Sequence, residues 1–186
     1  MPRLIGSSPP SSPERHDVSR EPLGLPFDPI ERAGEIWQAK FGPAAAMRVA
    51  TSVMRAQQLL LARYDELLKP YGLTFARYEA LVLLHFSHAG ELPLSMIGER
   101  LMVHPTSVTN IIGRLATQGF VERRPNPQDG RGVLARLTAS GRQTVKRATD
   151  DLMADDFGLG MYDERTLEAM FEQLRALRVA AGDYSV

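Results

Sequence analysis

Residues 94–138 read LSMIGERLMVHPTSVTNIIGRLATQGFVERRPNPQDGRGVLARLT. The first part has the spacing of two short helices, and Pro105 suits the first position of the second helix because its missing N–H needs no partner there. From Phe120 the spacing becomes strand-like, and the glycine- and proline-rich segment 125–132 predicts the tip of a hairpin. Two helices joined by a tight turn and followed by a hairpin are typical of a winged helix-turn-helix domain.

The second of these helices has two faces of different composition. Val108, Ile111, Ile112 and Leu115 form an apolar face that we expect to be buried. The opposite arc has short hydrogen-bonding side chains, one arginine and no acid, which suits a helix that binds in a DNA groove. An ordinary solvent-exposed face would usually mix Glu and Lys. The predicted DNA contacts on this helix are Thr106, Ser107, Thr109, Asn110 and Arg114.

The hairpin tip supplies a second set of predicted DNA contacts. Arg131 lies between two glycines, which permit a tight and protruding backbone. An arginine presented in this way fits a narrow minor groove, where the negative potential is enhanced. Asp129 is expected to orient Arg131 or to hold the tip to the helix behind it, and Arg124 is included as a further contact from the preceding strand.

Charge is strongly segregated along a chain whose formal net charge is zero over 186 residues. Residues 100–147 carry nine basic and two acidic side chains, a net charge of +7, whereas residues 151–186 have a net charge of −5. A basic block beside an acidic one indicates a single surface that faces a polyanion, with chance clustering on a solvated face as the alternative.

Several classes of function lack their required residues. The sequence has no cysteine, which excludes disulfides, cysteine-ligated metals and thiol chemistry. It has no apolar run of bilayer length and no leader in its first thirty residues, so we expect a cytoplasmic protein without membrane contact. Phosphate-loop, nucleophile-elbow, zincin and dinucleotide motifs are absent, which predicts a protein that is not an enzyme and needs no cofactor. His85 and His88 lack a third ligand, so no metal site is predicted.

The rest of the chain supplies a scaffold around this domain. Residues 1–27 are rich in proline and serine and are expected to be a disordered tail. Residues 28–42 are expected to form an extra helix. Residues 74–138 form the winged domain, in which the helix after Thr74 is expected to bury Tyr78 and Phe86. The long helix within 44–72 has apolar residues over a wider arc than one small domain buries. We therefore predict that 44–72 and 139–181 form a helical dimerisation region.

The segment 94–144 resembles the winged helix of the MarR family of transcription regulators, and the resemblance covers roughly residues 44–181. The most specific match is DGRGVLARLT (129–138), and GLTFARYEALVLL (72–84) is similar to the family's preceding helix. The resemblance implies a homodimer, double-stranded DNA as partner, and often a small aromatic or anionic ligand that weakens DNA binding. It also implies that Arg131 is the minor-groove arginine and that 106–114 is the recognition helix. Two positions depart from the family pattern: His104 replaces the usual capping serine, and Gly98 should loosen its helix by about 1 kcal/mol relative to alanine.

Together these features predict a mainly α fold with a small β-hairpin wing, and a dimeric, sequence-specific DNA-binding regulator. A twofold dimer would place its two recognition helices about 34 Å apart on a pseudo-palindromic site. We expect a repressor that is relieved by a small aromatic or anionic ligand. Alternatives are a ligand-independent DNA-binding protein and a winged helix that binds another protein. Candidate ligand-binding residues, each with an ordinary structural role as the alternative, are Trp37, Arg55, Arg77 and His85.

Overall fold

The computed structural model describes residues 24–127 and 129–184, and the predicted tail lies outside them up to residue 23. The chain divides into two compact units at Arg48 and Val49. In the first unit, helix α1 (Pro29–Lys40) begins where the side chain of Asp28 accepts a hydrogen bond of 2.8 Å from the amide of Ile30. The rings of Trp37 and Phe41 lie 5.0 Å apart at its end, and both side chains are exposed.

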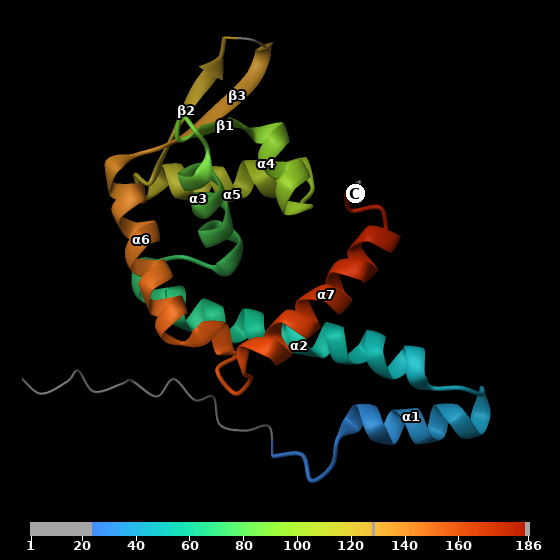
Figure 1. The fold of residues 1–186 in the computed structure, drawn as a ribbon. Coiled ribbons are helices and arrows are strands. Elements are labelled where there is room, and N and C mark those ends of the chain that lie inside the picture. Colours follow the sequence, from blue (N-terminus) through green and yellow to red (C-terminus); the bar gives the residue numbers. More distant parts are fainter. Residues whose placement is uncertain (1–23, 128, 185–186) are drawn as a thin grey trace, which may run out of the picture. The chain divides into compact units, whose positions relative to one another are not determined.

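The second unit contains the winged helix-turn-helix domain. After α2 (Ala45–Leu68), which begins in the first unit, come η1 (Lys69–Tyr71), α3 (Phe75–Phe86), β1 (Glu91–Pro93), α4 (Leu94–Leu101), α5 (Pro105–Thr117), β2 (Val121–Asn126), β3 (Asp129–Leu137), α6 (Ala139–Ala154), η2 (Asp156–Gly158) and α7 (Glu164–Ala180). The sheet is antiparallel in the order β1-β3-β2, so the wing hairpin gains a third strand from the segment before α4. Figure 1 shows the hairpin extending beyond the helices. The predicted fold class is confirmed.

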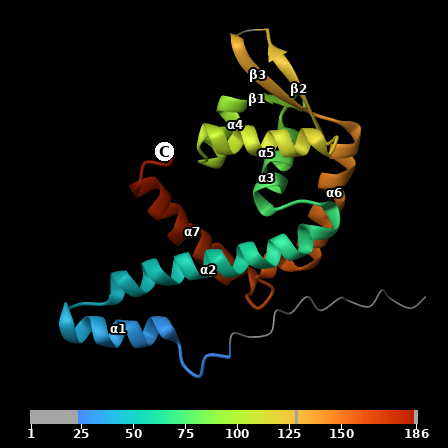
Figure 2. The same ribbon diagram turned by 180° about the vertical axis from the view of Figure 1, so that it is seen from behind.

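The core of this unit lies where α3, α4 and α5 meet the sheet, and Figure 2 shows these three helices close together. Leu81 and Leu84 of α3, Ile97 of α4 and Ile112 of α5 are fully buried. Leu152 adds the inner face of α6 to the same cluster. Because burial of each such side chain contributes about 1.5–3 kcal/mol, this cluster fixes how α5 is presented.

A small hydrogen-bonded junction joins α6 to the turn between α5 and β2. The hydroxyl of Thr138 accepts a bond of 3.0 Å from the amide of Gly141 and donates to the carbonyl of Gly119 at 2.8 Å. The amide of Thr138 donates to the carbonyl of Phe120 at 3.0 Å. Thr138 is thus both the N-cap of α6 and a hydrogen-bonded link to the end of the recognition helix.

One expectation about a side chain needs correction, and Gly98 has a packing role besides its predicted effect on the helix. Phe86 is 80% exposed rather than buried, because it is the last residue of α3 and the chain leaves the helix at Ser87. Gly98 does more than weaken its helix. A Cβ at this position would lie 3.1 Å from Val108 Cγ2 and 3.2 Å from the carbonyl oxygen of Val103, so the glycine lets α5 approach α4 closely.

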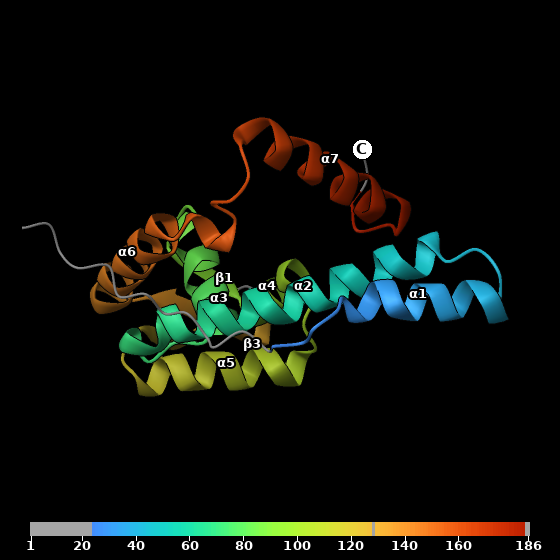
Figure 3. The same ribbon diagram turned by 90° about the horizontal axis from the view of Figure 1, so that it is seen from below.

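The elbow between α6 and α7 is fastened to α2. The guanidinium of Arg63 pairs with Asp155, with a bond of 2.6 Å from Nε to Oδ2, and the hydroxyl of Tyr64 donates to the carbonyl of Phe157 at 2.8 Å. Asp156 and Phe157 have positive φ, which allows the sharp turn after α6. Helix α7 then projects away from α3 and α5, as Figure 3 shows, and none of its residues is buried.

Tyr71 provides a pH-dependent contact between η1 and α6. Its hydroxyl donates to Asp151 Oδ2 at 2.5 Å, and burial, followed by this bond and the charge of Asp151, raises the pKa of Tyr71 from 10.0 to about 12. A raised pKa means that the folded state holds the proton more tightly, so the stabilisation is full below pH 10 and is lost between about pH 10 and 12.

We expect Tyr71→Phe to lower the free energy of unfolding by about 1 kcal/mol at neutral pH. The difference from the parent protein should shrink as pH rises from about 10 to 12. Urea denaturation of both proteins at several pH values measures it. A difference that stays constant with pH would contradict the assigned role of the hydroxyl.

Candidate DNA-binding interface

The start of α5 is capped by an unusual residue. His104 is the N-cap, and its Nδ1 accepts a hydrogen bond of 3.3 Å from the amide of Thr106, while Pro105 takes the first helical position. The substitution of histidine for serine therefore retains a cap bond, although a long one. The acceptor must be the unprotonated nitrogen, because a protonated Nδ1 is a donor.

The outward arc of α5 has the polar composition expected from the sequence. Val108, Ile112 and Leu115 are buried and Ile111 is partly buried. Thr109 donates its hydroxyl proton to the carbonyl of Pro105 at 3.0 Å, which leaves the hydroxyl oxygen as an acceptor. All five side chains predicted to contact DNA from this helix are exposed: Thr106, Ser107, Thr109, Asn110 and Arg114.

The wing is the hairpin of β2 and β3, closed by a short turn at Pro127. Asn126 pairs with Asp129 beyond an irregularity in the register at Pro125. Asp129 is exposed, and a Cβ on Gly132 would lie 2.9 Å from its Oδ2, so the carboxylate lies against the backbone of Gly132. The backbone of Arg131 belongs to β3 next to this glycine, while its side chain is outside the description.

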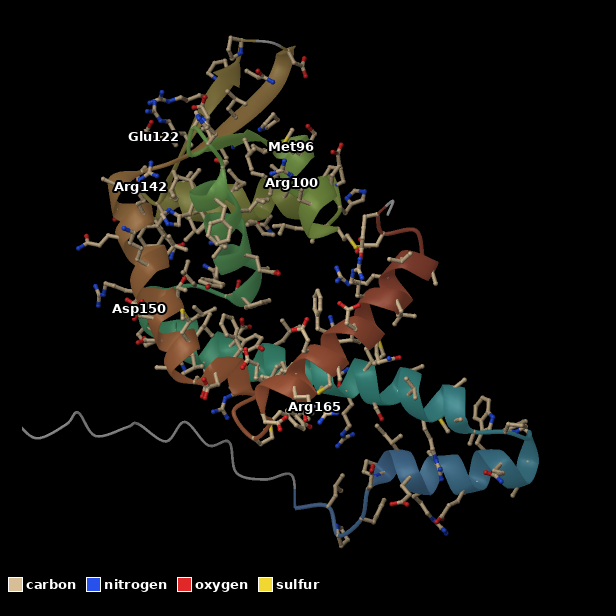
Figure 4. All side chains as sticks on the ribbon, in the orientation of Figure 1. Met96, Arg100, Glu122, Arg142, Asp150 and Arg165 are labelled. Atoms are coloured by element: carbon tan, nitrogen blue, oxygen red, sulfur yellow. The ribbon has the colours of Figure 1, made fainter. Side chains whose placement is uncertain are left out.

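Glu122 is a residue that the sequence analysis did not select. Its Oε2 accepts two bonds from Arg124, of 2.6 Å from Nη2 and 3.2 Å from Nε, and both side chains are about half exposed. Figure 4 shows Glu122 at the base of the wing. Residues two apart on a strand point to the same face, so this spacing could have indicated the pair. Arg124 must share its guanidinium between Glu122 and any phosphate that it contacts.

We expect Glu122→Gln to strengthen DNA binding by about 3–10-fold at low salt, because the change releases Arg124 and removes a negative charge near the DNA. Fluorescence anisotropy with a labelled duplex measures the dissociation constant. Glu168→Gln, the same change on α7, is the control and should leave it unchanged. Equal or weaker binding by Glu122→Gln would contradict a DNA-facing role for Arg124.

A hollow of about 430 Å³ adjoins the recognition helix. Thr74 and Arg77 line it from the start of α3, and Asn110, Ile111 and Arg114 line it from α5. Arg77 was predicted as a ligand-binding residue, and the structure brings it beside two of the predicted DNA contacts. Thr74 stands at the N-cap position of α3, where its hydroxyl accepts a bond of 3.2 Å from Arg77 Nε.

The other predicted ligand-binding residues do not line this hollow. Trp37 lies in the first unit, and Arg55 is partly buried on α2. His85 is near the end of α3, and its Nδ1 is buried without a hydrogen-bond partner in the part of the chain that the structure describes. A buried imidazole nitrogen without a partner is costly, so a bound group that forms a hydrogen bond with Nδ1 would remove this cost.

Over residues 24–127 and 129–184, no three histidine, aspartate or glutamate side chains gather in a group that could hold a metal ion. In the same residues, no helix has the length and apolar character to cross a membrane.

The helical scaffold, the polar arc of α5 and the basic wing define a winged helix-turn-helix protein. The MarR family model matches residues 71–132, and the chain belongs to the MarR family of transcriptional regulators. Among curated proteins, the HTH-type transcriptional repressor IacR of Pseudomonas putida is 31% identical over 121 residues, which cover 61% of this chain and 71% of IacR.

Solved structures show the same fold. The MarR family regulator Sco5413 of Streptomyces coelicolor is 61% identical with a TM-score of 0.71, and the match covers 76% of this chain and 98% of Sco5413. A mutant of MarR from E. coli in complex with operator DNA is 21% identical with a TM-score of 0.65, over 76% of this chain and 97% of that one.

Proposed function

We propose that this protein is a cytoplasmic, dimeric, sequence-specific DNA-binding repressor whose binding is weakened by a small aromatic or anionic ligand. The observation that carries the proposal is the outward arc of α5, where five polar or basic side chains are exposed and none is acidic. Their hydrogen-bonding groups match base edges and phosphates in the major groove. The proposal agrees with operator binding by the MarR structure and with the description of IacR as a repressor.

The proposed dimer rests on apolar surface that a single chain leaves exposed. Phe171, Leu174 and Leu177 of α7 are 50%, 44% and 58% exposed, and Met54 and Leu59 of α2 are 59% and 52% exposed. Such helix faces favour burial against a second copy, and twofold dimers are the commonest arrangement. A twofold dimer would present its recognition helices to successive turns of one duplex.

A gel shift with the DNA upstream of the protein's own gene, followed by hydroxyl-radical footprinting, tests the proposal. We expect protection of two segments about one helical turn apart. Absence of any shift at low salt, or protection of a single segment, would overturn it. A winged helix that binds only another protein would give no shift.

Arg131→Ala should weaken binding about 10-fold, with the largest loss on duplexes whose flanks are rich in A·T pairs, because their narrow minor groove attracts arginine. Anisotropy with A·T-rich and G·C-rich flanks measures this difference. Arg165→Ala, on the exposed surface of α7, serves as the control. Equal affinity of the Arg131 variant and the parent protein would refute the assignment of the wing to the minor groove.

The ligand part of the proposal is tested separately. A thermal-shift screen with aromatic acids and purines should find compounds that stabilise the protein and also release the duplex. If the protein binds DNA but no such compound releases it, the ligand-independent alternative is correct. If a compound does release the duplex, His85→Phe should still bind DNA, and loss of the ligand response in that variant would support a role for His85.

A further inference from the structure

The hollow beside α5 brings together cations from two different helices. Arg77 comes from the first turn of α3 and Arg114 from the third turn of α5, and the other lining residues are Thr74, Asn110 and Ile111. None of the lining side chains is acidic. In the part of the chain that the structure describes, neither arginine forms an ion pair with a carboxylate. The hollow therefore has two positive charges that are not neutralised within the protein.

Local hydrogen bonds to neutral groups hold Arg77 in place. Its Nε donates to the hydroxyl of Thr74 at 3.2 Å, and its Nη1 donates to the carbonyl of Gly72 at 3.0 Å. The same carbonyl accepts a bond of 2.9 Å from Gln118 Nε2, next to the end of α5. Arg77 is thus oriented relative to the recognition helix, and its charge and three of its five N–H donors remain available.

This arrangement suits an anion with several oxygens. A guanidinium is planar and always charged, so it binds phosphate through two parallel hydrogen bonds. Asn110 and Arg114 belong to the arc of α5 that we propose to face DNA. An anion in the hollow would therefore lie beside the bound duplex, where backbone phosphates are present at every nucleotide.

We propose that Arg77, with Arg114, holds one backbone phosphate of the bound DNA and so fixes the register of the recognition helix. This inference rests on the proposed function and assigns Arg77 to the DNA rather than to an effector pocket. A phosphate contact positions the protein without reading sequence, so loss of Arg77 should weaken binding to every duplex alike. Loss of a base contact would weaken binding only to the selected duplex, and loss of an effector site would remove the release of DNA by an added anion.

The test compares Arg77→Gln with the parent protein on the duplex that the full chain selects from a random pool and on a scrambled duplex of equal length. We expect about 10-fold weaker binding to both, with an unchanged ratio between them. The slope of log affinity against log salt should fall in magnitude by about 2 per dimer, which corresponds to one phosphate per protomer. Arg32→Gln on α1 removes the same charge from the first unit and should leave the slope unchanged.

Other results would overturn the proposal. An unchanged salt slope would exclude a phosphate contact, and a loss confined to the selected duplex would indicate a base contact. Release of DNA by millimolar inorganic phosphate at constant ionic strength, in the parent but not in Arg77→Gln, would indicate a site for a free anion. Arg77→Lys controls for folding, because it keeps the positive charge. It should retain the salt slope of the parent protein, although lysine cannot form the two parallel hydrogen bonds of a guanidinium. If the parent protein binds no duplex, the proposed function fails first.

Discussion

Replacement of Leu174 and Leu177 by glutamate should convert the proposed dimer into monomers and lower DNA affinity by about 100-fold or more. Both leucines lie on the face of α7 that also carries Phe171 and Met170, and this helix buries none of its residues within one chain. If the dimer buries these leucines fully, the four of them contribute roughly 6–12 kcal/mol. Four buried carboxylates would add an unfavourable term, so a stable dimer should not form.

The loss of DNA affinity follows from the loss of the second half-site. In a dimer, binding of one recognition helix holds the other close to its half-site at a high effective concentration. A monomer forfeits this advantage and makes half of the phosphate contacts, so its salt dependence should also be halved. Sedimentation equilibrium measures the oligomeric state, and anisotropy measures the affinity.

Gln173→Glu is the matched control, because it adds a charge to an exposed polar position of the same helix. It should leave both the dimer and the affinity unchanged. Far-ultraviolet circular dichroism should show that the winged domain of the double variant stays folded, since α7 contributes nothing to its buried core. A double variant that sediments as a dimer would show that α7 does not form the interface.

Gly141→Ala should strongly destabilise the protein, although it removes no atom, because the structure leaves no room for the added methyl group. A Cβ at this position would overlap the carbonyl oxygen of Phe120 and lie 2.9 Å from Leu137 Cδ1. The backbone of Phe120 cannot move freely, because its carbonyl accepts a hydrogen bond from the backbone amide of Thr138. We expect a loss of about 3 kcal/mol or more, as for overpacking against a fixed partner. For a domain of this size, the midpoint of thermal unfolding should fall by about 10 °C.

Gly113→Ala is the control, with the same chemical change in the middle of α5. A Cβ at Gly113 meets no atom within 4 Å, and the residue is helical. Alanine should therefore stabilise the protein by about 1 kcal/mol through helix propensity. Urea denaturation of the two variants would thus give changes of opposite sign. Equal stability of Gly141→Ala and the parent protein would mean that the junction of α6 with Phe120 is looser than the structure shows.

Local signals in the sequence were enough to predict the recognition helix and the wing. Pro105 marks the start of α5, and Gly119 has a φ of +76° just past its end, a conformation that favours glycine after a helix. The apolar positions 108, 112 and 115 repeat at helical spacing, so the buried face and the exposed polar arc both follow from periodicity.

Other features depend on tertiary contacts that periodicity does not report. The approach of Gly98 to Val108 requires knowledge of how α4 packs on α5. The position of Arg77 beside Asn110 and Arg114 likewise depends on packing between α3 and α5. The elbow has positive φ at Asp156, Phe157 and Gly158, and only Gly158 is a residue type that signals this conformation in the sequence.

The most direct test of the central claim is the binding isotherm of the full chain on its selected duplex, recorded over a range of salt. A dimer that presents two polar-faced α5 helices should bind one duplex, so the isotherm should give two chains per duplex. With about four phosphates neutralised per chain, the slope of log affinity against log salt should be near −7. One chain per duplex, or an affinity that does not change with salt, would contradict the account.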